Sequence, residues 1–316
     1  MSLIVKGLTK KYGEKTVVDH LSFAIEEPGV YALLGTNGAG KTTSIRMMLG
    51  MLARDEGEVL WKGAPLRLET CNVGYLAEER GLYPKYTLMD QVKYFASLRG
   101  VEGQEAASRI RYWARRLEVE EYLYPMKTTR QGRQVPAPSS KADQLSKGNQ
   151  QKIQFMLALI SDPELLILDE PLSGLDPVNT DLFKGIIREE IGKGKYLIMS
   201  SHQMATVEEF CTDITIMDRS RTVLQGNLNE IKKGYGRVNL KLKTTEDVSQ
   251  LVRASGADIL TEKENEYQIK VRSEEQAMGL LRELTERRIT VVTFDLQEPS
   301  LHEIFVEKVG NPDENV

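Results

Sequence analysis

The residues with the strongest chemical pattern lie near the start of the chain, between a short apolar run and a helix-like segment. They are Gly35, Thr36, Asn37, Gly38, Ala39, Gly40, Lys41, Thr42 and Thr43, and they contain the spacing G-x-x-x-x-G-K-[ST]. Glycines let the backbone bend so that its N–H groups converge on phosphate oxygens, and a helix start adds a partial positive charge. We expect Lys41 to reach the β and γ phosphates of a nucleotide, and the Thr42 hydroxyl to bind Mg²⁺.

A second candidate site follows the apolar run Leu165–Leu168, which ends in the adjacent carboxylates Asp169 and Glu170. In an open parallel sheet, ligands bind outside the carboxyl ends of the strands. Asp169 is therefore expected to hold Mg²⁺ through water, and Glu170 to polarise an attacking water as a general base. Alone, the pair is as well explained by a strand that exits into a polar loop; the phosphate loop favours the catalytic interpretation.

These groups need parallel strands to bring them together. Gly29–Leu34, Leu165–Leu168 and Tyr196–Met199 are short apolar runs, and residues 41–52 have helical composition. Strands that alternate with helices predict an α/β fold with a parallel sheet covered on both faces. Residues 3–8 and 17–25 predict further strands of an edge sheet, and residues 86–123 are mostly helix-forming.

Composition excludes several classes of protein. A formal net charge of −4 and a pI near 5.7 give no signal for nucleic acid. No run approaches the roughly 18 apolar residues of a membrane helix, and the N-terminus lacks the parts of a signal peptide. Cys71 and Cys211 lie far apart, which favours a reducing, cytosolic setting over a metal or disulfide framework.

Residues between and after these motifs resemble the ATP-binding subunits of ABC transporters. Leu145-Ser146-Lys147-Gly148-Asn149 resembles the ABC signature, Ser173-Gly174-Leu175-Asp176 resembles the D-loop, and Ser200-Ser201-His202 resembles the switch histidine. Tyr12 lies where the family stacks an aromatic ring on adenine. The resemblance covers the whole first block of the chain, in order and in spacing. A P-loop NTPase domain of the ABC type, with a mixed sheet and a helical subdomain at about 85–150, is the fold it implies.

The resemblance also implies roles for single residues. Tyr12 stacks on the base of ATP, and residues 35–43 wrap its phosphates. His202 contacts the γ phosphate, and with Glu170 and Lys41 it makes up the catalytic set. Ser146 and Gly148 contact ATP bound to the opposite subunit, while Asp176 lies at the dimer interface. One chain then holds two half-sites, so it requires a second ATPase subunit, in a homodimer or a heterodimer.

Two positions depart from the family pattern. Lys147 and Asn149 replace the third and fifth residues of the signature Leu-Ser-Gly-Gly-Gln. Glu78 stands at the position of the Q-loop glutamine. A carboxylate still ligates Mg²⁺ or its water, so the expected metal ligands are Thr42, Glu78 and Asp169, but it donates no amide hydrogen bond to a phosphate. Both departures resemble a subgroup of bacterial drug and sodium exporter ATPases.

Two further segments complete the predicted organisation, with domain limits at residues 1–228 and 229–316. Residues 125–140 contain prolines, hydroxyls and cations, which predict a flexible insertion. Its cations either touch a permease or lipid head groups or are simply solvated. The second block, with strands at 238–243, 267–271 and 289–294 and an amphipathic helix at 276–288, predicts a small α+β domain of ferredoxin-like type.

The expected function is ATP hydrolysis that powers export through a separate membrane permease, from the cytoplasmic face of the membrane. Residues 80–98 are expected to take the permease's coupling helix, and no nucleic acid partner is expected. Two other classes stay open. A soluble ABC ATPase acting on ribosomes or nucleic acid is disfavoured because this chain has one cassette and no long coiled coil. A nucleotide-dependent regulator without turnover would lack steady-state ATPase activity.

Overall fold

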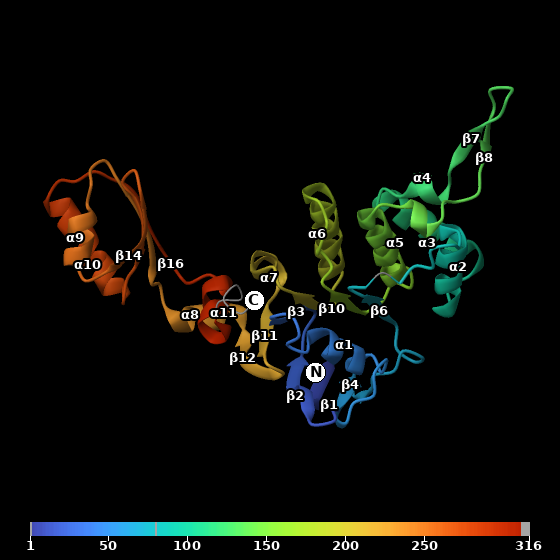
Figure 1. The fold of residues 1–316 in the computed structure, drawn as a ribbon, viewed down its shortest axis with the longest axis horizontal. Coiled ribbons are helices and arrows are strands. Elements are labelled where there is room, and N and C mark those ends of the chain that lie inside the picture. Colours follow the sequence, from blue (N-terminus) through green and yellow to red (C-terminus); the bar gives the residue numbers. More distant parts are fainter. Residues whose placement is uncertain (1, 80, 311–316) are drawn as a thin grey trace. The chain divides into compact units, whose positions relative to one another are not determined.

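A computed structural model describes residues 2–79 and 81–310 of the chain (Figure 1). The chain forms two compact units, Met1–Gln225 and Gly226–Val316. The predicted boundary lies a few residues later, after Leu228. The difference has a local cause: the Asn227 side chain accepts hydrogen bonds from two backbone N–H groups at the start of the helix that begins at Leu228, so the cap and the helix stay in one unit.

The centre of the first unit is a six-stranded sheet in the order β12-β11-β3-β10-β9-β6. Strands β3, β10, β9, β6 and β11 pair in parallel. Their carboxyl ends therefore meet at one edge, where the phosphate loop, Asp169 and the residues after β10 follow. The bounds are β3 Gly29–Gly35, β6 Val73–Leu76, β9 Leu165–Asp169, β10 Tyr196–Ser201, β11 Asp213–Asp218 and β12 Arg221–Asn227.

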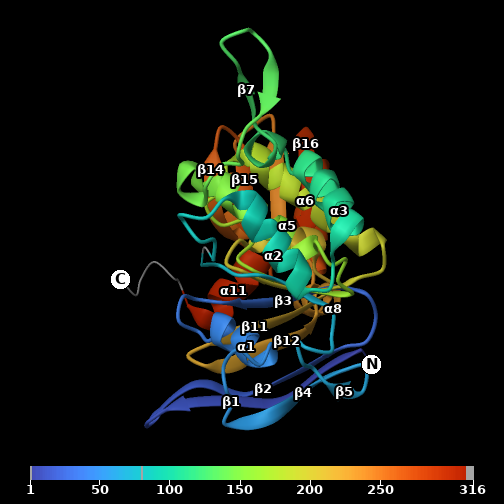
Figure 2. The ribbon, with the colours of Figure 1, turned by 90° about the vertical axis from the view of Figure 1, so that its right-hand side faces the viewer.

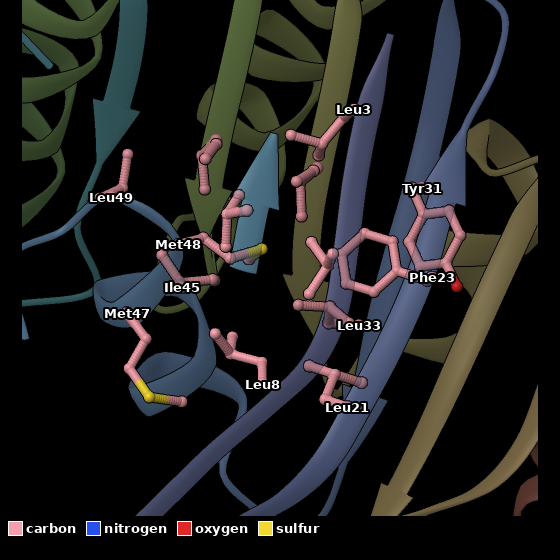
Figure 3. Close-up of a cluster of buried hydrophobic side chains, with 14 of the residues drawn as sticks. Leu3, Leu8, Leu21, Phe23, Tyr31, Leu33, Ile45, Met47, Met48 and Leu49 are labelled. Atoms are coloured by element: carbon pink, nitrogen blue, oxygen red, sulfur yellow. The ribbon is translucent and has the colours of Figure 1, made fainter. Parts of the chain in front are cut away.

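A second, antiparallel sheet of the first unit has the order β2-β1-β4-β5. Apolar side chains of this sheet, of β3 and of helix α1 form one buried cluster (Figure 3). Phe23 stacks on Tyr31 at 4.4 Å between ring centroids, and Ile45 and Met48 of α1 are fully or almost fully buried. Each such side chain contributes roughly 1.5–3 kcal/mol by leaving water. The bounds are β1 Leu3–Tyr12, β2 Lys15–Ile25, β4 Glu56–Trp61, β5 Ala64–Pro65 and α1 Lys41–Met48.

Helices make up most of residues 88–159 of the first unit, and local capping explains where several of them begin. Thr87, Ser146 and Asp176 each accept a hydrogen bond from the backbone N–H three residues on, which fixes the starts of α2, α5 and α6. The bounds are α2 Leu88–Leu98, α3 Gly103–Arg116, α4 Glu120–Leu123, the 3-10 turn Ala142–Gln144, α5 Lys147–Leu159, α6 Pro177–Gly192 and α7 Met204–Phe210. Across residues 2–79 and 81–310, no helix has the length and apolarity to cross a bilayer.

The segment at 125–140, which was predicted as a flexible insertion, contains a β-hairpin. Strand β7 (Met126–Thr128) pairs antiparallel with β8 (Gln134–Pro136), and the hairpin projects from the helical part near α4 (Figures 1 and 2). Gly132 closes the turn at φ 76°, and the N–H of Thr129 donates to the carbonyl of Arg133 at 2.8 Å. Each strand is only 3 residues long, so the alternation was too short to predict strands.

The second unit has a strand-helix-strand-strand-helix-strand order between helices α8 and α11, with a sheet in the order β14-β15-β13-β16. Its core contains Leu240, Leu242, Tyr267 and Ile269 from the sheet and Leu280 from a helix. The predicted helix 276–288 begins earlier, because Ser273 caps it. The bounds are α8 Leu228–Tyr235, β13 Asn239–Thr244, α9 Ser249–Ala254, β14 Asp258–Lys263, β15 Glu266–Lys270, α10 Glu274–Glu286, β16 Val291–Gln297 and α11 Leu301–Val309.

Candidate functional site

The phosphate loop lies between β3 and α1, as its sequence predicts. Gly40, the residue before α1, has φ 107°. A Cβ atom on Gly40 would lie 2.6 Å from the carbonyl oxygen of Val17, and one on Gly35 would lie 2.5 Å from that of Met217. Both glycines are therefore required because other backbone segments approach the loop closely. Asn37 and Gly38 at the tip are exposed, so the tip is open to a ligand.

Lys41 is buried at the start of α1, and its ammonium group folds back onto the loop. Nζ donates to the carbonyl oxygens of Gly35 at 2.8 Å and Thr36 at 3.2 Å. Burial lowers the pKa of Lys41, and the nearby carboxylates of Glu170 and Asp169 partly offset this by raising it. A buried cation held by neutral carbonyls is available to an anionic ligand such as a phosphate.

Asp169, at the end of β9, is 1% exposed and only half satisfied. Its Oδ1 accepts from the Ser200 hydroxyl at 2.5 Å. Among the described residues, Oδ2 of Asp169 is the buried side-chain polar atom that has no hydrogen-bond partner. Burial raises the pKa of Asp169, and the hydroxyls of Ser200 and Thr42 lower it in part. Oδ2 of Asp169 and the hydroxyl oxygen of Thr42 are hard oxygen ligands of the kind that Mg²⁺ prefers.

Glu170 follows directly and has φ 50°, in the left-handed region that non-glycine residues seldom adopt. Its backbone N–H donates to the Ser200 hydroxyl at 2.9 Å. Its Oε2 lies 2.8 Å from Nδ1 of His202, and since a carboxylate only accepts, Nδ1 carries the proton in this contact. Glu170 is buried, while the His202 side chain is 55% exposed. The pair joins an enclosed carboxylate to an imidazole that faces solvent.

Glu78 and Tyr12 occupy the outer parts of the site. Glu78 follows β6, which lies next to β9, and is exposed. Its charge is near enough to raise the pKa of Lys41, so it contributes to the same electrostatic environment. Tyr12 ends β1 on the antiparallel sheet, where its ring is 55% exposed and Nζ of Lys10 lies 5.3 Å from the ring centroid.

The signature residues lie on a different element, at the start of α5. The Ser146 side chain is exposed and accepts from the N–H of Asn149 at 3.2 Å. The nearest atoms to a Cβ on Gly148 would belong to Asn179 at 3.5 Å and Leu175 at 3.8 Å. Asp176 caps α6 by accepting from the N–H of Asn179 at 2.9 Å. The signature and the D-loop are therefore neighbours within this chain, and each presents its polar groups outward.

Two residues with roles in the site were not assigned from the sequence. Ser200 bridges Asp169 and Glu170, and Gln151 donates from Nε2 to the carbonyl of Pro171 at 2.8 Å, which ties α5 to the loop after Glu170. Ser200 lies near the end of β10, two residues before His202. A prediction of how β10 pairs with β9 could therefore have placed Ser200 opposite Asp169. Gln151 carried no such signal, because its partner is a backbone carbonyl.

Known families match both units. A family model described as ABC transporter matches residues 18–173, and one described as ATP-binding protein DrrA1-3-like, C-terminal domain, matches residues 226–309. The chain is 40% identical over 309 residues to the ABC transporter ATP-binding protein YhaQ of Bacillus subtilis (strain 168), covering 98% of both chains. It is 27% identical to the linearmycin resistance ATP-binding protein LnrL of the same organism, again over 98% of each.

Further similarity extends to an export protein and to solved structures. The Nod factor export ATP-binding protein I of Ralstonia nicotianae (strain ATCC BAA-1114 / GMI1000) is 32% identical, with 72% of this chain and 68% of that protein covered. A structure titled as the ATP binding subunit of an ABC transporter superposes with a TM-score of 0.64 at 27% identity, covering 75% of this chain and 94% of that one. The chain belongs to the ABC transporter ATP-binding proteins and is an ATPase of that family.

Proposed function

We propose that this chain is one half of an ATPase pair that binds ATP and Mg²⁺ between two subunits and powers export through a separate permease. The observation that carries the proposal is the position of Ser146 and Gly148. They lie at the start of α5 with the signature hydroxyl exposed, while the phosphate loop begins α1 beside the central sheet. A second subunit that presents the same signature to this phosphate loop would complete the site.

Mg²⁺ fits the residues at the carboxyl edge of the sheet. Asp169 offers the unpaired Oδ2, and the Thr42 hydroxyl lies close by. Among the described residues, no group of three or more His, Cys, Asp or Glu side chains could hold a metal ion. Phosphate oxygens of ATP would complete the ligand set, with Glu78 as a third protein ligand. The ion would supply positive charge to the β and γ phosphates.

Glu170 is the proposed general base. Its buried carboxylate is held 2.8 Å from His202, so the imidazole N–H orients one oxygen and leaves the other for a water. In hydrolysis, Glu170 would accept the proton of the attacking water as that oxygen approaches the γ phosphorus. His202 is exposed enough to reach the γ phosphate, and Lys41 would neutralise the charge that develops on the phosphate.

The permease is proposed to dock on an aromatic cluster of the helical part, made of the exposed Tyr83 and Tyr86 and the half-buried Phe95. Tyr83 lies 6.0 Å from Tyr86 and 6.5 Å from Phe95 between ring centroids, and Tyr86 is 65% exposed. The buried side chain of Gln91 fixes the turn, since its Nε2 donates to the carbonyls of Tyr83 and Tyr86. Rigid exposed aromatics are typical anchors of protein interfaces. Residue 80 of the predicted docking segment lies outside the described residues.

Export, rather than import, is supported by relatives. The linearmycin resistance protein matches over nearly its full length, and a Nod factor export protein matches over 72% of this chain. With a permease in the membrane, this chain would act at the cytoplasmic face.

A Glu170→Gln variant tests the paired mechanism. The amide keeps the shape of the side chain and cannot accept a proton, so hydrolysis should fall by about 10²–10⁴-fold while ATP is still bound. The variant should then accumulate as an ATP-dependent dimer, measured by light scattering after size exclusion. Adding Ser146→Ala should weaken that dimer. If the Glu170→Gln protein hydrolyses ATP at the wild-type rate, or stays monomeric with ATP, the proposed mechanism of an ATPase pair is wrong. Sedimentation with ribosomes instead of membranes would contradict the transport role.

A further inference from the structure

One buried hydroxyl joins the two acidic residues of the site. Ser200, in β10, is 0% exposed and lies directly opposite Asp169 in the parallel β10–β9 ladder. Its hydroxyl donates to Oδ1 of Asp169 at 2.5 Å and accepts from the backbone N–H of Glu170 at 2.9 Å. The hydroxyl thus donates one hydrogen bond and accepts another, and its two partners are adjacent residues with different proposed functions.

We propose that Ser200 is a positioning residue for ATP hydrolysis, which orients Asp169 toward the metal and holds the backbone of Glu170 in its catalytic conformation. The inference rests on the roles proposed above for Asp169 and Glu170. It adds that their relative placement is set by the neighbouring strand and not by their own chain segment alone.

The effect on Asp169 follows from the use of its two oxygens. The bond from Ser200 engages Oδ1, and Oδ2 is left without a partner in the described part of the chain. A carboxylate fixed through one oxygen presents the other in one direction, and the Thr42 hydroxyl is near enough to lower the pKa of Asp169. Hydrogen-bond partners that orient a metal ligand commonly change metal affinity by about 10–100-fold when they are removed.

The effect on Glu170 follows from its backbone. At φ 50° the residue has a conformation that disfavours any side chain with a Cβ. The N–H of Glu170 is buried in the sheet edge and donates to Ser200, so the hydroxyl compensates for that conformation. The chain continues directly after β10 to His202, which contacts the Glu170 carboxylate at 2.8 Å. Strand β10 therefore holds the backbone of Glu170 through Ser200, and the residue that follows the end of β10, His202, holds its side chain.

The test compares Ser200→Ala with a matched loss of a buried hydroxyl elsewhere in the sheet. Thr215, in strand β11 of the same sheet, is 0% exposed and its hydroxyl forms a hydrogen bond with the Tyr31 hydroxyl at 2.6 Å. Thr215→Val removes that bond while keeping the shape of the side chain. Ser200→Thr keeps the hydroxyl at position 200 and serves as the conservative variant.

Steady-state ATPase activity of the purified chain, at concentrations where it dimerises, gives kcat and KM. Ser200→Ala should lower kcat on the order of 100-fold, because a small misplacement of catalytic groups has that cost. The KM for ATP should stay within about threefold, since the phosphate loop is unchanged. Ser200→Thr should recover most of kcat, and Thr215→Val should retain the wild-type kcat at a lowered Tm.

A second readout does not depend on turnover. Mn²⁺ binding to the ATP-loaded Glu170→Gln protein, followed by electron paramagnetic resonance, should weaken by about tenfold when Ser200→Ala is added. In the same Glu170→Gln protein, Ser200→Ala should not lower the residual ATPase rate further by displacing residue 170, because the side chain at that position has already lost its catalytic function.

The outcomes separate the inference from the proposed function. Wild-type kcat and Mn²⁺ affinity in Ser200→Ala would overturn the role of Ser200 while leaving an inactive Glu170→Gln variant to support the general base. Equal losses of kcat in Ser200→Ala and Thr215→Val, in proportion to Tm, would reduce Ser200 to a structural residue. Full activity in Glu170→Gln would remove the proposed function itself.

Discussion

Buried charged residues lie at both edges of the central sheet, but they form ion pairs at the amino edge and remain available to a ligand at the carboxyl edge. At the amino edge, Glu190 is fully buried and forms ion pairs with both Lys195 and Lys193. Lys195 also pairs with Asp162. At the carboxyl edge, Lys41 bonds two backbone carbonyls and Asp169 keeps one oxygen unpaired. Removing one partner of a buried ion pair destabilises a fold, whereas a buried charge without a counter-charge raises the free energy of the fold until a ligand satisfies it.

The largest contrast should come from replacing a buried lysine at each edge. Lys41→Met removes the cation that faces the phosphates, so kcat/KM for ATP should fall by about 10³-fold. Lys195→Met, at the opposite edge, should leave kcat/KM within about threefold and lower the stability to urea instead. ATPase assays and equilibrium unfolding of both variants measure the contrast. Similar kinetic losses in the two proteins would show that the comparison is wrong.

Removal of the buried ion pair between Glu190 and Lys195 at the amino edge should give the next largest effect. Glu190→Gln leaves Lys195 buried without its closest anion, and its free energy of unfolding should fall by about 3 kcal/mol. Denaturant titration followed by fluorescence gives this value. ATP affinity, measured by calorimetry on the same protein, should stay unchanged, since Glu190 lies away from the carboxyl ends of the strands. A loss of ATP affinity without a loss of stability would reverse the assignment of the two edges.

A smaller effect is expected at the exposed rim of the catalytic edge. Glu78→Gln restores the amide usual in the family and removes a charge that raises the pKa of Lys41. The Mg²⁺ concentration needed for half-maximal activity should change by roughly threefold, because Glu78 is solvated and its influence is screened. Metal titration of the ATPase rate measures it. A loss as large as that of Lys41→Met would place Glu78 among the essential ligands.

The smallest effect concerns pH at the paired edge. The hydrogen bond from Lys195 holds the pKa of Asp162 below its usual value of 3.8. The folded pKa is lower than the unfolded one, so this stabilisation is present above about pH 4 and is lost as the pH falls through the folded value. Asp162 is largely exposed, so the contribution is about 1 kcal/mol or less. Asp162→Asn should flatten the acid side of the stability curve, which unfolding between pH 3 and 6 would record.

Sequence patterns predicted the strands that carry the site better than they predicted the hydrogen bonds between residues. The strands β3, β9 and β10 were each visible as short apolar runs, bounded by Gly35 after β3 and by polar residues in the other two. The hairpin at 126–136 was missed because its strands are too short for alternation to show. The start of α10 was placed late because the capping role of Ser273 is a hydrogen bond and not a hydrophobic pattern.

The sequence by itself determined the chemical types and their spacing: the glycines and Lys41 of the phosphate loop, and the carboxylates after an apolar strand. Only the tertiary structure decided that Ser200 lies opposite Asp169, and that Gly40 must make room for Val17. The physical reason is that β10 lies between β3 and β9 in the sheet although it follows both in the chain. Local preferences fix a strand and its ends, while the order of strands depends on packing of the whole unit.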